Sequence, residues 1–462
     1  MASGIPDDFW ACAELRHADP GDARRVHRLI RIVAAASQNP EESIPGLFAN
    51  QRDAAKAAYR FFDNKRVEAH AILQAHGQAT VDRIQAAGLR LVLLVEDTTQ
   101  FDFTKHHATT GLGSTGAPGL SGFFLHSTLA LEPAAGAPLG VLDAHWWVRN
   151  DPPGEPHPSK RAIEDKESGR WLDALQRSTD ALPRDLRTLT VADREADIFE
   201  FFAFARDLGR HVLVRAHHDR NVLVDGEARG LWEAARAAEP LGVVAFTVPR
   251  DGDRPERRAT AVLQVVRVDV RPPKHLAARR LDPVPICAIR LQEIDVPAGQ
   301  EPISWLLLTS LAVDTIEQAD QCVLWYTYRW AIERFHFTLK SGGNYEKLQL
   351  ETADRLWRAL AVYMIVAWRL LYVDLVARTH PDAPCTTFLQ DDEWKALWCH
   401  RHKLPVAPPT PPDVHTAVRW LAMLGGFLGR KRDGEPGVKT LWRGLRRLQD
   451  LVEMWRIMQP SH

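Results

Sequence analysis

Four residues with the chemistry to hold a metal ion beside a phosphate follow one another at helical spacing in the second half of the chain. They are Tyr326, Arg329, Glu333 and Lys340. A regular helix turns by roughly 100° per residue, so their offsets of 3, 7 and 14 would bring the four side chains within about 60° of one another. A carboxylate would then be flanked by a phenol, a guanidinium and an ammonium group. The simpler alternative is an Arg329/Glu333 surface ion pair at i, i+4.

Two further carboxylates follow apolar runs that have the composition of buried strands. Residues 89–95 precede Glu96 and Asp97, and residues 186–192 precede Asp193. Nearly continuous apolar runs are typical of strands covered on both faces. Together with Glu333, the two aspartates would supply hard oxygen ligands for Mg²⁺ or Mn²⁺, and two such ions can assist phosphoryl transfer. The alternative for each aspartate is a strand-end or helix N-cap role.

The order of the surrounding elements suggests how these carboxylates meet. A strand ending at Asp97 is followed by a strand hairpin, a helix, a strand ending at Asp193 and later the helix that carries Glu333. This order predicts an α/β fold with a ribonuclease-H-like mixed sheet and an inserted β-rich subdomain at about 220–300. The nearby acidic residues that we do not assign to the site are Glu96, Asp102, Glu195 and Asp197.

Changes in composition along the chain divide it into three predicted domains. Residues 1–75 read as helices, residues 76–375 hold the strand-rich part, and proline-rich segments break up the helical remainder at 376–462. The predicted helices that matter for the site run from about 315 to 340 and from 353 to 377. The predicted strands of the central part, besides the two named above, are residues 123–131, 139–148, 211–215, 261–270 and 305–309.

Composition excludes several classes of protein. With 45% hydrophobic and 25% charged residues the chain is an ordinary globular one, and no apolar stretch long enough to cross a membrane lacks charge. We therefore expect a cytoplasmic, nucleoid-associated protein without a membrane partner. The five cysteines are odd in number and scattered, which favours neither a disulfide framework nor a zinc site.

Charge is balanced overall but uneven along the chain. The net charge is −1, yet two segments gather basic residues with few acids between them. Such local surfaces can bind phosphate, although a solvated helix face is the simpler explanation. The basic residues of the two segments are Arg24, Arg25, Arg28 and Arg31 near the start, and Arg430, Lys431, Arg432, Lys439, Arg443, Arg446 and Arg447 near the end.

The motifs together resemble a known family. The spacing Tyr326-x2-Arg329-x3-Glu333-x6-Lys340 is similar to the YREK signature of the insertion-sequence-four family of bacterial DDE transposases. Residues 95–99 and 192–198 resemble that family's blocks around its first two catalytic aspartates. The resemblance extends through residues 57–61, 145–148 and 305–310.

The resemblance implies roles for particular residues. Asp97, Asp193 and Glu333 would be catalytic and would coordinate two Mg²⁺ ions, for which Mn²⁺ could substitute. The residues expected to bind DNA are Tyr326, Arg329, Lys340, Arg215 and Trp305, the last of which would stack on a flipped base. From the residues alone, an ordinary sheet-core tryptophan is the preferred interpretation of Trp305, and the resemblance reverses that preference.

The resemblance also implies the reaction and the partners. These are cut-and-paste transposition on transposon-end DNA and target DNA, in a synaptic homodimer. The N-terminal helices would recognise the transposon end and the C-terminal helices would form the dimer.

Two alternatives stay open at this point, and a third can be set aside. The first is a ribonuclease-H-like DNA nuclease without strand transfer, and the second is a non-catalytic repressor derived from a transposase. The third is a dinucleotide enzyme, because Gly111, Gly113 and Gly116 match G-x-G-x-x-G. A strand rather than a helix is predicted after these glycines, and no Walker-type sequence is present, so we expect no nucleotide cofactor.

Overall fold

The first apolar run of the sequence forms strand β1 (Leu91–Asp102), and this strand is shared between two units of the computed structural model. One unit comprises Met1–Leu89, Thr98–Pro153 and Ala331–His462, and the other comprises Arg90–Asp97 and Gly154–Trp330. The structure describes residues 9–19, 21–48, 51–116, 119–149, 163, 166–248, 257–342, 344–430 and 434–458. The sequential boundaries near residues 75 and 375 stay predictions.

Parallel strands open the sheet of the second unit. The start of β1 pairs with β5 (Arg187–Ala192), and β5 pairs with β6 (His211–Arg215), both in parallel. Beyond β6 the insertion is β-rich, as predicted, but its strands extend the same sheet instead of forming a separate small one. The reason is that β12 (Ser304–Thr309) returns antiparallel beside β6 and so covers its edge. The other strands of the insertion are β7 (Asn221–Val224), β8 (Glu227–Gly230), β9 (Pro240–Val248), β10 (Arg257–Val270) and β11 (Val284–Ile294).

Side-chain alternation divides the two faces of this sheet between different helices. Val212, Val214 and Ala216 are buried in a core with Trp171 of α6 and Phe202 of α7. Residues at the odd positions of β6 must therefore point to the opposite face. The helices of the second unit are α6 (Arg170–Asp180), α7 (Phe199–Asp207), α8 (Leu231–Ala237) and α9 (Ile316–Thr327).

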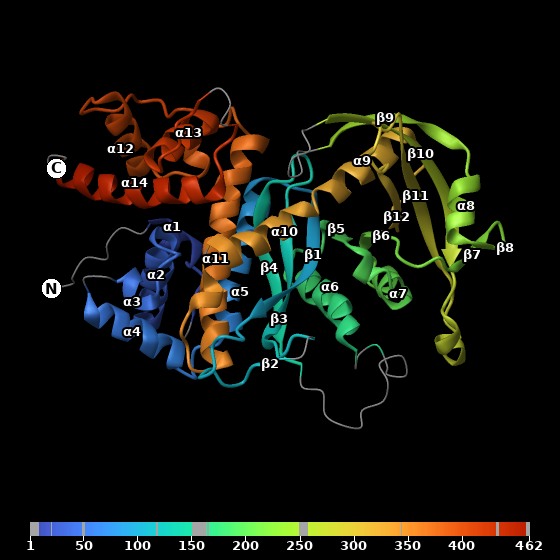
Figure 1. The fold of residues 1–462 in the computed structure, drawn as a ribbon, viewed down its shortest axis with the longest axis horizontal. Coiled ribbons are helices and arrows are strands. Elements are labelled where there is room, and N and C mark those ends of the chain that lie inside the picture. Colours follow the sequence, from blue (N-terminus) through green and yellow to red (C-terminus); the bar gives the residue numbers. More distant parts are fainter. Residues whose placement is uncertain are drawn as a thin grey trace. The chain divides into compact units, whose positions relative to one another are not determined.

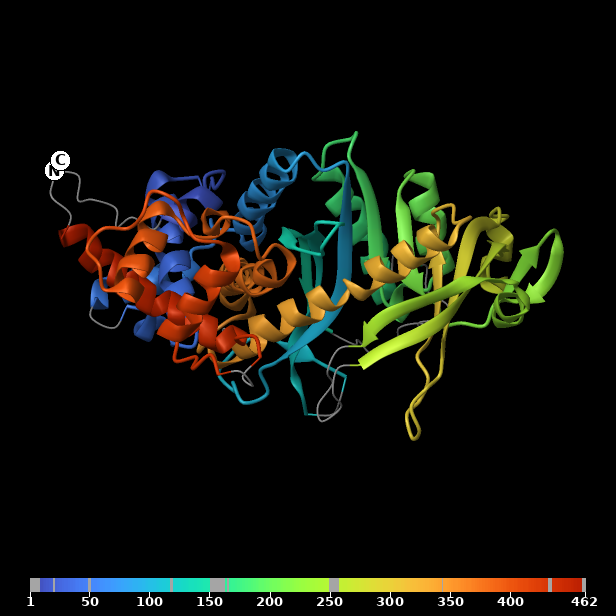
Figure 2. The same cartoon turned by 90° about the horizontal axis from the view of Figure 1, so that it is seen from above.

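The first unit is organised around one long apolar helix, α11 (Ala353–Thr379). Of the helices that the structure describes, α11 alone has the length and hydropathy of a membrane span, but 89% of that apolar window is buried. It is therefore the core helix of this unit, and the N-terminal and C-terminal helices gather along it (Figure 1; Figure 2). Those helices are α1 (Phe9–Glu14), α2 (Ala23–Gln38), α3 (Ile44–Leu47), α4 (Arg52–Asp63), α5 (Ala69–Ala86), α12 (Asp391–His402), α13 (Val414–Leu424) and α14 (Val438–Met458).

The remaining strands of the first unit form the predicted hairpin. Strand β3 (Ser121–Leu131) pairs antiparallel with β4 (Pro138–Trp147) and with the short β2 (Gly113–Ser114). The order along the chain is thus one strand, an antiparallel hairpin, a helix and two strands parallel to the first. This is the ribonuclease-H-like mixed α/β fold that the sequence predicts.

The predicted single helix from 315 to 340 is wrong. It is divided into α9, α10 (Trp330–Phe337) and a π-helical turn at Thr338–Gly342. At the first division, Tyr328 and Arg329 donate their backbone N–H groups to the carbonyls three residues earlier, which overwinds the chain. The assumption of 100° per residue therefore fails both before Glu333 and at Lys340.

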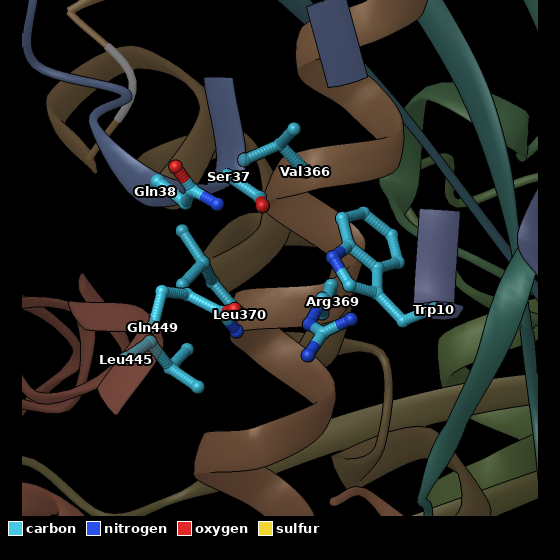
Figure 3. Close-up of a pocket in the computed structure, with 8 residues that line it drawn as sticks. All are labelled: Trp10, Ser37, Gln38, Val366, Arg369, Leu370, Leu445 and Gln449. Atoms are coloured by element: carbon cyan, nitrogen blue, oxygen red, sulfur yellow. The ribbon is translucent and has the colours of Figure 1, made fainter. Parts of the chain in front are cut away.

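A buried charged network joins α1, α11, α12 and α14 within the first unit, and Figure 3 shows its residues Trp10, Arg369 and Gln449. The guanidinium of Arg369 lies 4.0 Å from the ring centroid of Trp10, and its nitrogen is 3.7 Å from a carboxylate oxygen of Glu393. Gln449 donates to the same carboxylate at 2.9 Å. Arg369 and Glu393 are only 8% and 5% exposed, so each is the other's buried counter-charge.

We predict that Arg369→Ala lowers the free energy of unfolding by about 3–5 kcal/mol, because it leaves the Glu393 carboxylate buried without its cation. Chemical denaturation monitored by circular dichroism measures the change. The control is Arg355→Ala on the same helix, whose ion-pair partners Asp63 and Glu351 are 61% and 76% exposed. It should cost less than about 1 kcal/mol. Equal losses in the two variants would contradict a special role for Arg369.

Candidate active site

Strand register places Asp97, Asp193 and Arg215 in one row across the parallel strands of the second unit. Val95 pairs with Val191, and Ala192 pairs with Val214. Continuing the β1–β5 register by two residues aligns Asp97 with Asp193. Continuing the β5–β6 register by one residue aligns Asp193 with Arg215. Neighbouring strands are about 4.8 Å apart, so the two carboxylates and the guanidinium start from adjacent backbone positions on one face of the sheet.

The strand-end prediction holds for Asp193 and needs correction for Asp97. Asp193 follows the last residue of β5, and its Oδ1 accepts from the Glu195 N–H at 2.8 Å, so it also caps the turn at Arg194–Ala196. Asp97 lies inside β1, which continues to Asp102. What ends near Asp97 is the pairing of β1 with β5, not the strand.

Helix α9 and the residues after it bring further predicted residues to this face. A nitrogen of Arg329 lies 3.9 Å from a carboxylate oxygen of Asp97, and the two side chains are 14% and 18% exposed. Half-buried Trp305 of β12 contacts the ring of Tyr326 edge-on at 5.3 Å between centroids. The Arg215 guanidinium lies 5.9 Å from the Trp305 centroid. The second unit therefore assembles two aspartates, two arginines and two aromatic rings.

Tyr326 lies deeper than its predicted role suggests. It is only 5% exposed. Burial raises the pKa of its phenol, while the neighbouring guanidinium groups of Arg329 and Arg215 act to lower that pKa. Burial likewise lowers the pKa of Arg215, and the nearby Tyr326 acts to raise it. The phenol thus stays protonated and contributes to positioning the two arginines, with little surface left for a ligand.

Glu333 and Lys340 belong to the first unit, on α10 and the π-helical turn. Glu333 is exposed, whereas His336, three residues later, is buried. Ser127 Oγ of β3 lies 2.9 Å from His336 Nε2. Burial lowers the pKa of His336 to about 3, with Lys340 contributing in the same direction, so the imidazole is neutral. A neutral hydrogen-bonded histidine thus anchors the segment that presents Glu333 and Lys340.

The donor chemistry of the row fits a divalent metal ion. Asp97 and Asp193 are hard oxygen ligands, which Mg²⁺ and Mn²⁺ prefer. The part of the chain that the structure describes holds no set of three or more His, Cys, Asp or Glu side chains close enough to bind a metal ion. The complete triad with Glu333 therefore stays a prediction.

Sequence reasoning missed two aromatic residues beside Glu333. Trp330 is 54% exposed and Phe337 is 61% exposed on the same helix, α10. The sequence pattern could have identified them. Two large aromatic residues occupy positions of this helix where polar residues are expected.

The N-terminal basic surface is larger than its sequence cluster. Arg60 of α4 belongs to the same surface as Arg28 and Arg31 of α2. Burial lowers the pKa of Arg28, and the charges of Arg31 and Arg60 act in the same direction. In the C-terminal cluster, Lys431 and Arg432 lie outside the described residues. The residues of that cluster on α14 are Lys439, Arg443, Arg446 and Arg447.

Three family models match successive parts of the chain. A transposase DNA-binding model matches residues 7–67, a transposase DDE domain model matches residues 154–369, and a transposase Tn5 dimerisation domain model matches residues 365–460. The chain has the domain composition of a DDE transposase. DNA and a second copy of the chain are therefore its partners, and divalent metal ions are the cofactors of its DDE domain. The likeness of its motifs to the transposase of transposon five agrees with the third match.

The matched ranges divide the candidate residues. The DDE range contains Asp193, Glu333 and the predicted DNA-binding residues, whereas Asp97 precedes it. The assignment of Asp97 in this transposase therefore rests on its sequence block and on its register with Asp193.

We predict that Ser127→Ala loosens α10, because it leaves the buried His336 nitrogen without its partner, at a cost of about 1–3 kcal/mol. Hydrogen exchange should become faster at residues 330–342. The matched control is Ser178→Ala on α6, another buried serine, whose hydroxyl bonds to Ala174 O within its own helix. If exchange in α10 is the same in wild type and both variants, the anchoring role is wrong.

Proposed function

We propose that the protein is a cut-and-paste transposase of the insertion-sequence-four type. Asp97, Asp193 and Glu333 would hold two Mg²⁺ ions, with Mn²⁺ able to substitute. Arg215, Arg329 and Lys340 would bind the phosphates of the transposon end, Tyr326 would position the arginines, and Trp305 would stack on an unpaired base. The observation that carries the proposal is the row of Asp97, Asp193 and Arg215 on the face that α9 covers.

The proposed reaction is a series of in-line phosphoryl transfers. Water attacks the phosphodiester at the transposon end, a new P–O bond forms and the leaving 3′-oxygen takes a proton. The freed 3′-hydroxyl attacks the opposite strand, which closes a hairpin and releases the flanking DNA. A second water opens the hairpin, and the restored 3′-hydroxyl attacks target DNA. When bound, the metal ions would activate each attacking oxygen and stabilise each leaving one.

The chain's own charges support this chemistry. Two carboxylates on neighbouring strands repel each other unless cations neutralise them. Arg329 faces Asp97, and Arg215 follows Asp193 in the row, so guanidinium groups border the carboxylates on both sides. Arginine binds phosphate through two parallel hydrogen bonds, which would orient the scissile phosphate beside the metal ligands.

The remaining parts of the proposal concern DNA recognition and assembly. Arg28, Arg31 and Arg60 lie within the range of the DNA-binding match, and the charges of Arg31 and Arg60 act on Arg28. We assign the transposon end to this surface. In the synaptic homodimer, each active site would cut the end bound mainly by the other subunit. The reaction uses no nucleotide cofactor, because each phosphodiester bond that forms replaces one that breaks.

We predict that purified protein cuts linear DNA carrying its element's terminal sequences only when Mg²⁺ or Mn²⁺ is supplied, and that a chelator stops the cutting. Asp97→Ala, Asp193→Ala and Glu333→Ala should each lower the cleavage rate at least about a thousandfold, because the ions contribute several kcal/mol of transition-state stabilisation. DNA binding in a gel-shift assay should persist. The control is Asp185→Ala, an exposed aspartate outside the site.

Each outcome of the cleavage experiment has a different interpretation. Intact cleavage in one of the three variants removes that residue from the metal site. Cleavage without hairpin products indicates a nuclease without strand transfer. Sequence-specific binding without any cleavage by wild type indicates a repressor.

A separate prediction concerns Trp305. Trp305→Ala should slow hairpin formation on a pre-nicked end more than it slows the first nick, because only the hairpin requires a base to leave the stack. Trp305→Phe should retain most of the rate, since a flat ring remains. Gel analysis of both products measures the two rates. Equal slowing of the two steps would instead favour a structural role for Trp305 in the sheet.

A further inference from the structure

The β-rich insertion holds a half-buried arginine, Arg290 of β11, whose bonding partners are all neutral. Its guanidinium donates to the side-chain oxygens of Gln264 and Gln292, the latter at 3.0 Å. In the part of the chain that the structure describes, no acidic side chain pairs with Arg290. A guanidinium has five N–H donors, so these two bonds leave others for a ligand. The positive charge of Arg290 is thus available to an external anion.

The charge that acts on Arg290 is itself positive. Burial lowers the pKa of the Arg290 guanidinium, and the charge of Arg236 acts in the same direction. Arg236 belongs to the last turn of α8, and its side chain is exposed. Like charges that act on each other are stabilised when an anion binds beside them. Arginine pairs are suited to phosphate in particular, because each guanidinium can offer it two parallel hydrogen bonds.

A buried amide, Gln264 of β10, connects the two arginines. Its side chain belongs to a residue that is only 7% exposed. The amide nitrogen donates to the backbone carbonyls of Arg236 and Ala238 at 3.1 and 2.5 Å, while the amide oxygen accepts from Arg290. Gln264 therefore ties the end of α8, which carries Arg236, to the guanidinium of Arg290. The pair is held in place before any ligand binds.

Strand register places this pair on the face of the sheet opposite the row that contains Arg215. Gln264 pairs with Arg290, and Arg290 pairs with Leu306, so these three side chains leave the same face. Leu306 packs in the core that also contains Val214. Arg215, the next residue of β6, points to the other face. The pair is therefore separate from the place where the row would bind a phosphate.

The neighbouring side chains on this face are polar as well. Gln292 is half-buried and follows Arg290 by two residues along β11, and exposed Ser304 of β12 pairs with it in the register. An amide and a hydroxyl thus accompany the guanidinium. These are the side chains that proteins use, together with arginine, to contact the sugar–phosphate backbone of DNA. Such contacts carry no sequence information, so they suit a DNA partner of arbitrary sequence.

We propose that Arg290 and Arg236 bind a backbone phosphate of target DNA, with Gln264 holding the two residues together. The occupant is target DNA and not the transposon end, because the proposed function already assigns that end to the opposite face of the sheet and to the N-terminal basic surface. The inference rests on the proposed function, since it assigns a target-binding surface for the last step of that reaction.

The first experiment measures binding of the full chain to a random-sequence duplex without transposon ends, by fluorescence anisotropy at several salt concentrations. Arg290→Ala should weaken binding about tenfold, because a charge-assisted contact to a phosphate is lost. The slope of log affinity against log salt concentration should become shallower by about 0.9, the value for one phosphate contact. Arg290→Lys should keep most of the slope, since the positive charge remains.

Arg236→Ala is the second variant. It should weaken binding and reduce the salt slope in the same direction as Arg290→Ala. Its side chain is exposed, so this substitution tests the site even if Arg290→Ala fails to fold, which thermal unfolding shows. Unchanged affinity and an unchanged slope in the folded variants would refute the proposed site.

The matched control is Arg229→Ala, which removes the same charge from β8 of the insertion. Arg229 forms an ion pair with Glu227 at 3.0 Å, and the two side chains are 44% and 73% exposed, so this guanidinium already has a counter-charge. The affinity should change less than about twofold, as is usual for an exposed ion pair, and the slope should stay the same. Equal effects of Arg290→Ala and Arg229→Ala would show that only the net charge matters and would contradict the proposal.

A strand-transfer assay distinguishes the two kinds of DNA. Arg290→Ala should lower the rate of strand transfer from a pre-cut end, relative to the rate of cleavage of an intact end, by about tenfold. Slower cleavage with an unchanged ratio would assign the site to the transposon end and overturn its assignment to target DNA. Absence of any metal-dependent nicking by wild type would refute the proposed function itself, whereas the anisotropy measurements would still decide whether the two arginines bind phosphate.

Discussion

The parallel register of β1, β5 and β6 is the constraint on which the candidate site depends. A one-residue slip in either pairing would turn one of Asp97, Asp193 and Arg215 to the opposite face. The pairings that set this register lie between enclosed apolar residues, since Val95, Val191 and Val214 are all inaccessible to solvent. The apolar runs that identify these strands therefore do more than build a core. They fix which charged side chains emerge together where the pairing of β1 with β5 ends.

The row of Asp97, Asp193 and Arg215 determines which charges are needed on the face of the sheet that α9 covers. Two aspartates starting from neighbouring strands need cations, and the structure supplies guanidinium groups from two directions, Arg215 along the sheet and Arg329 after α9. Tyr326 is buried against Trp305, and its uncharged phenol interacts with both of these arginines. A phosphate entering this corner would compete with Asp97 for the guanidinium of Arg329.

The sequence predicts the parts of the site that follow from periodicity. Continuous apolar runs locate the strands beside Asp97 and Asp193, and their order with the hairpin and helix is sufficient for the fold. The sequence could not reveal that β1 continues past Asp97. That continuation depends on β3 lying beside the later part of the strand, where the Phe103 N–H donates to the Ser121 carbonyl. Helical spacing also could not reveal the interruption of the helix before Glu333. There the backbone N–H groups bond to carbonyls three residues earlier instead of four. The buried carboxylate of Asp197 accepts from the backbone N–H groups of His217 and His218, about twenty residues away, and no local pattern encodes such a contact.

The third carboxylate poses a different problem, because the chain passes from one unit to the other at Asp97–Thr98 and again at Trp330–Ala331. Both crossings lie within three residues of a proposed metal ligand. Glu333 follows Arg329 by four residues, and Arg329 is the residue that faces Asp97. Its segment has an independent support, the neutral His336 bonded to Ser127. The proposed third ligand is thus held by a side-chain contact within the first unit, whereas the two aspartates are held by strand pairing in the second.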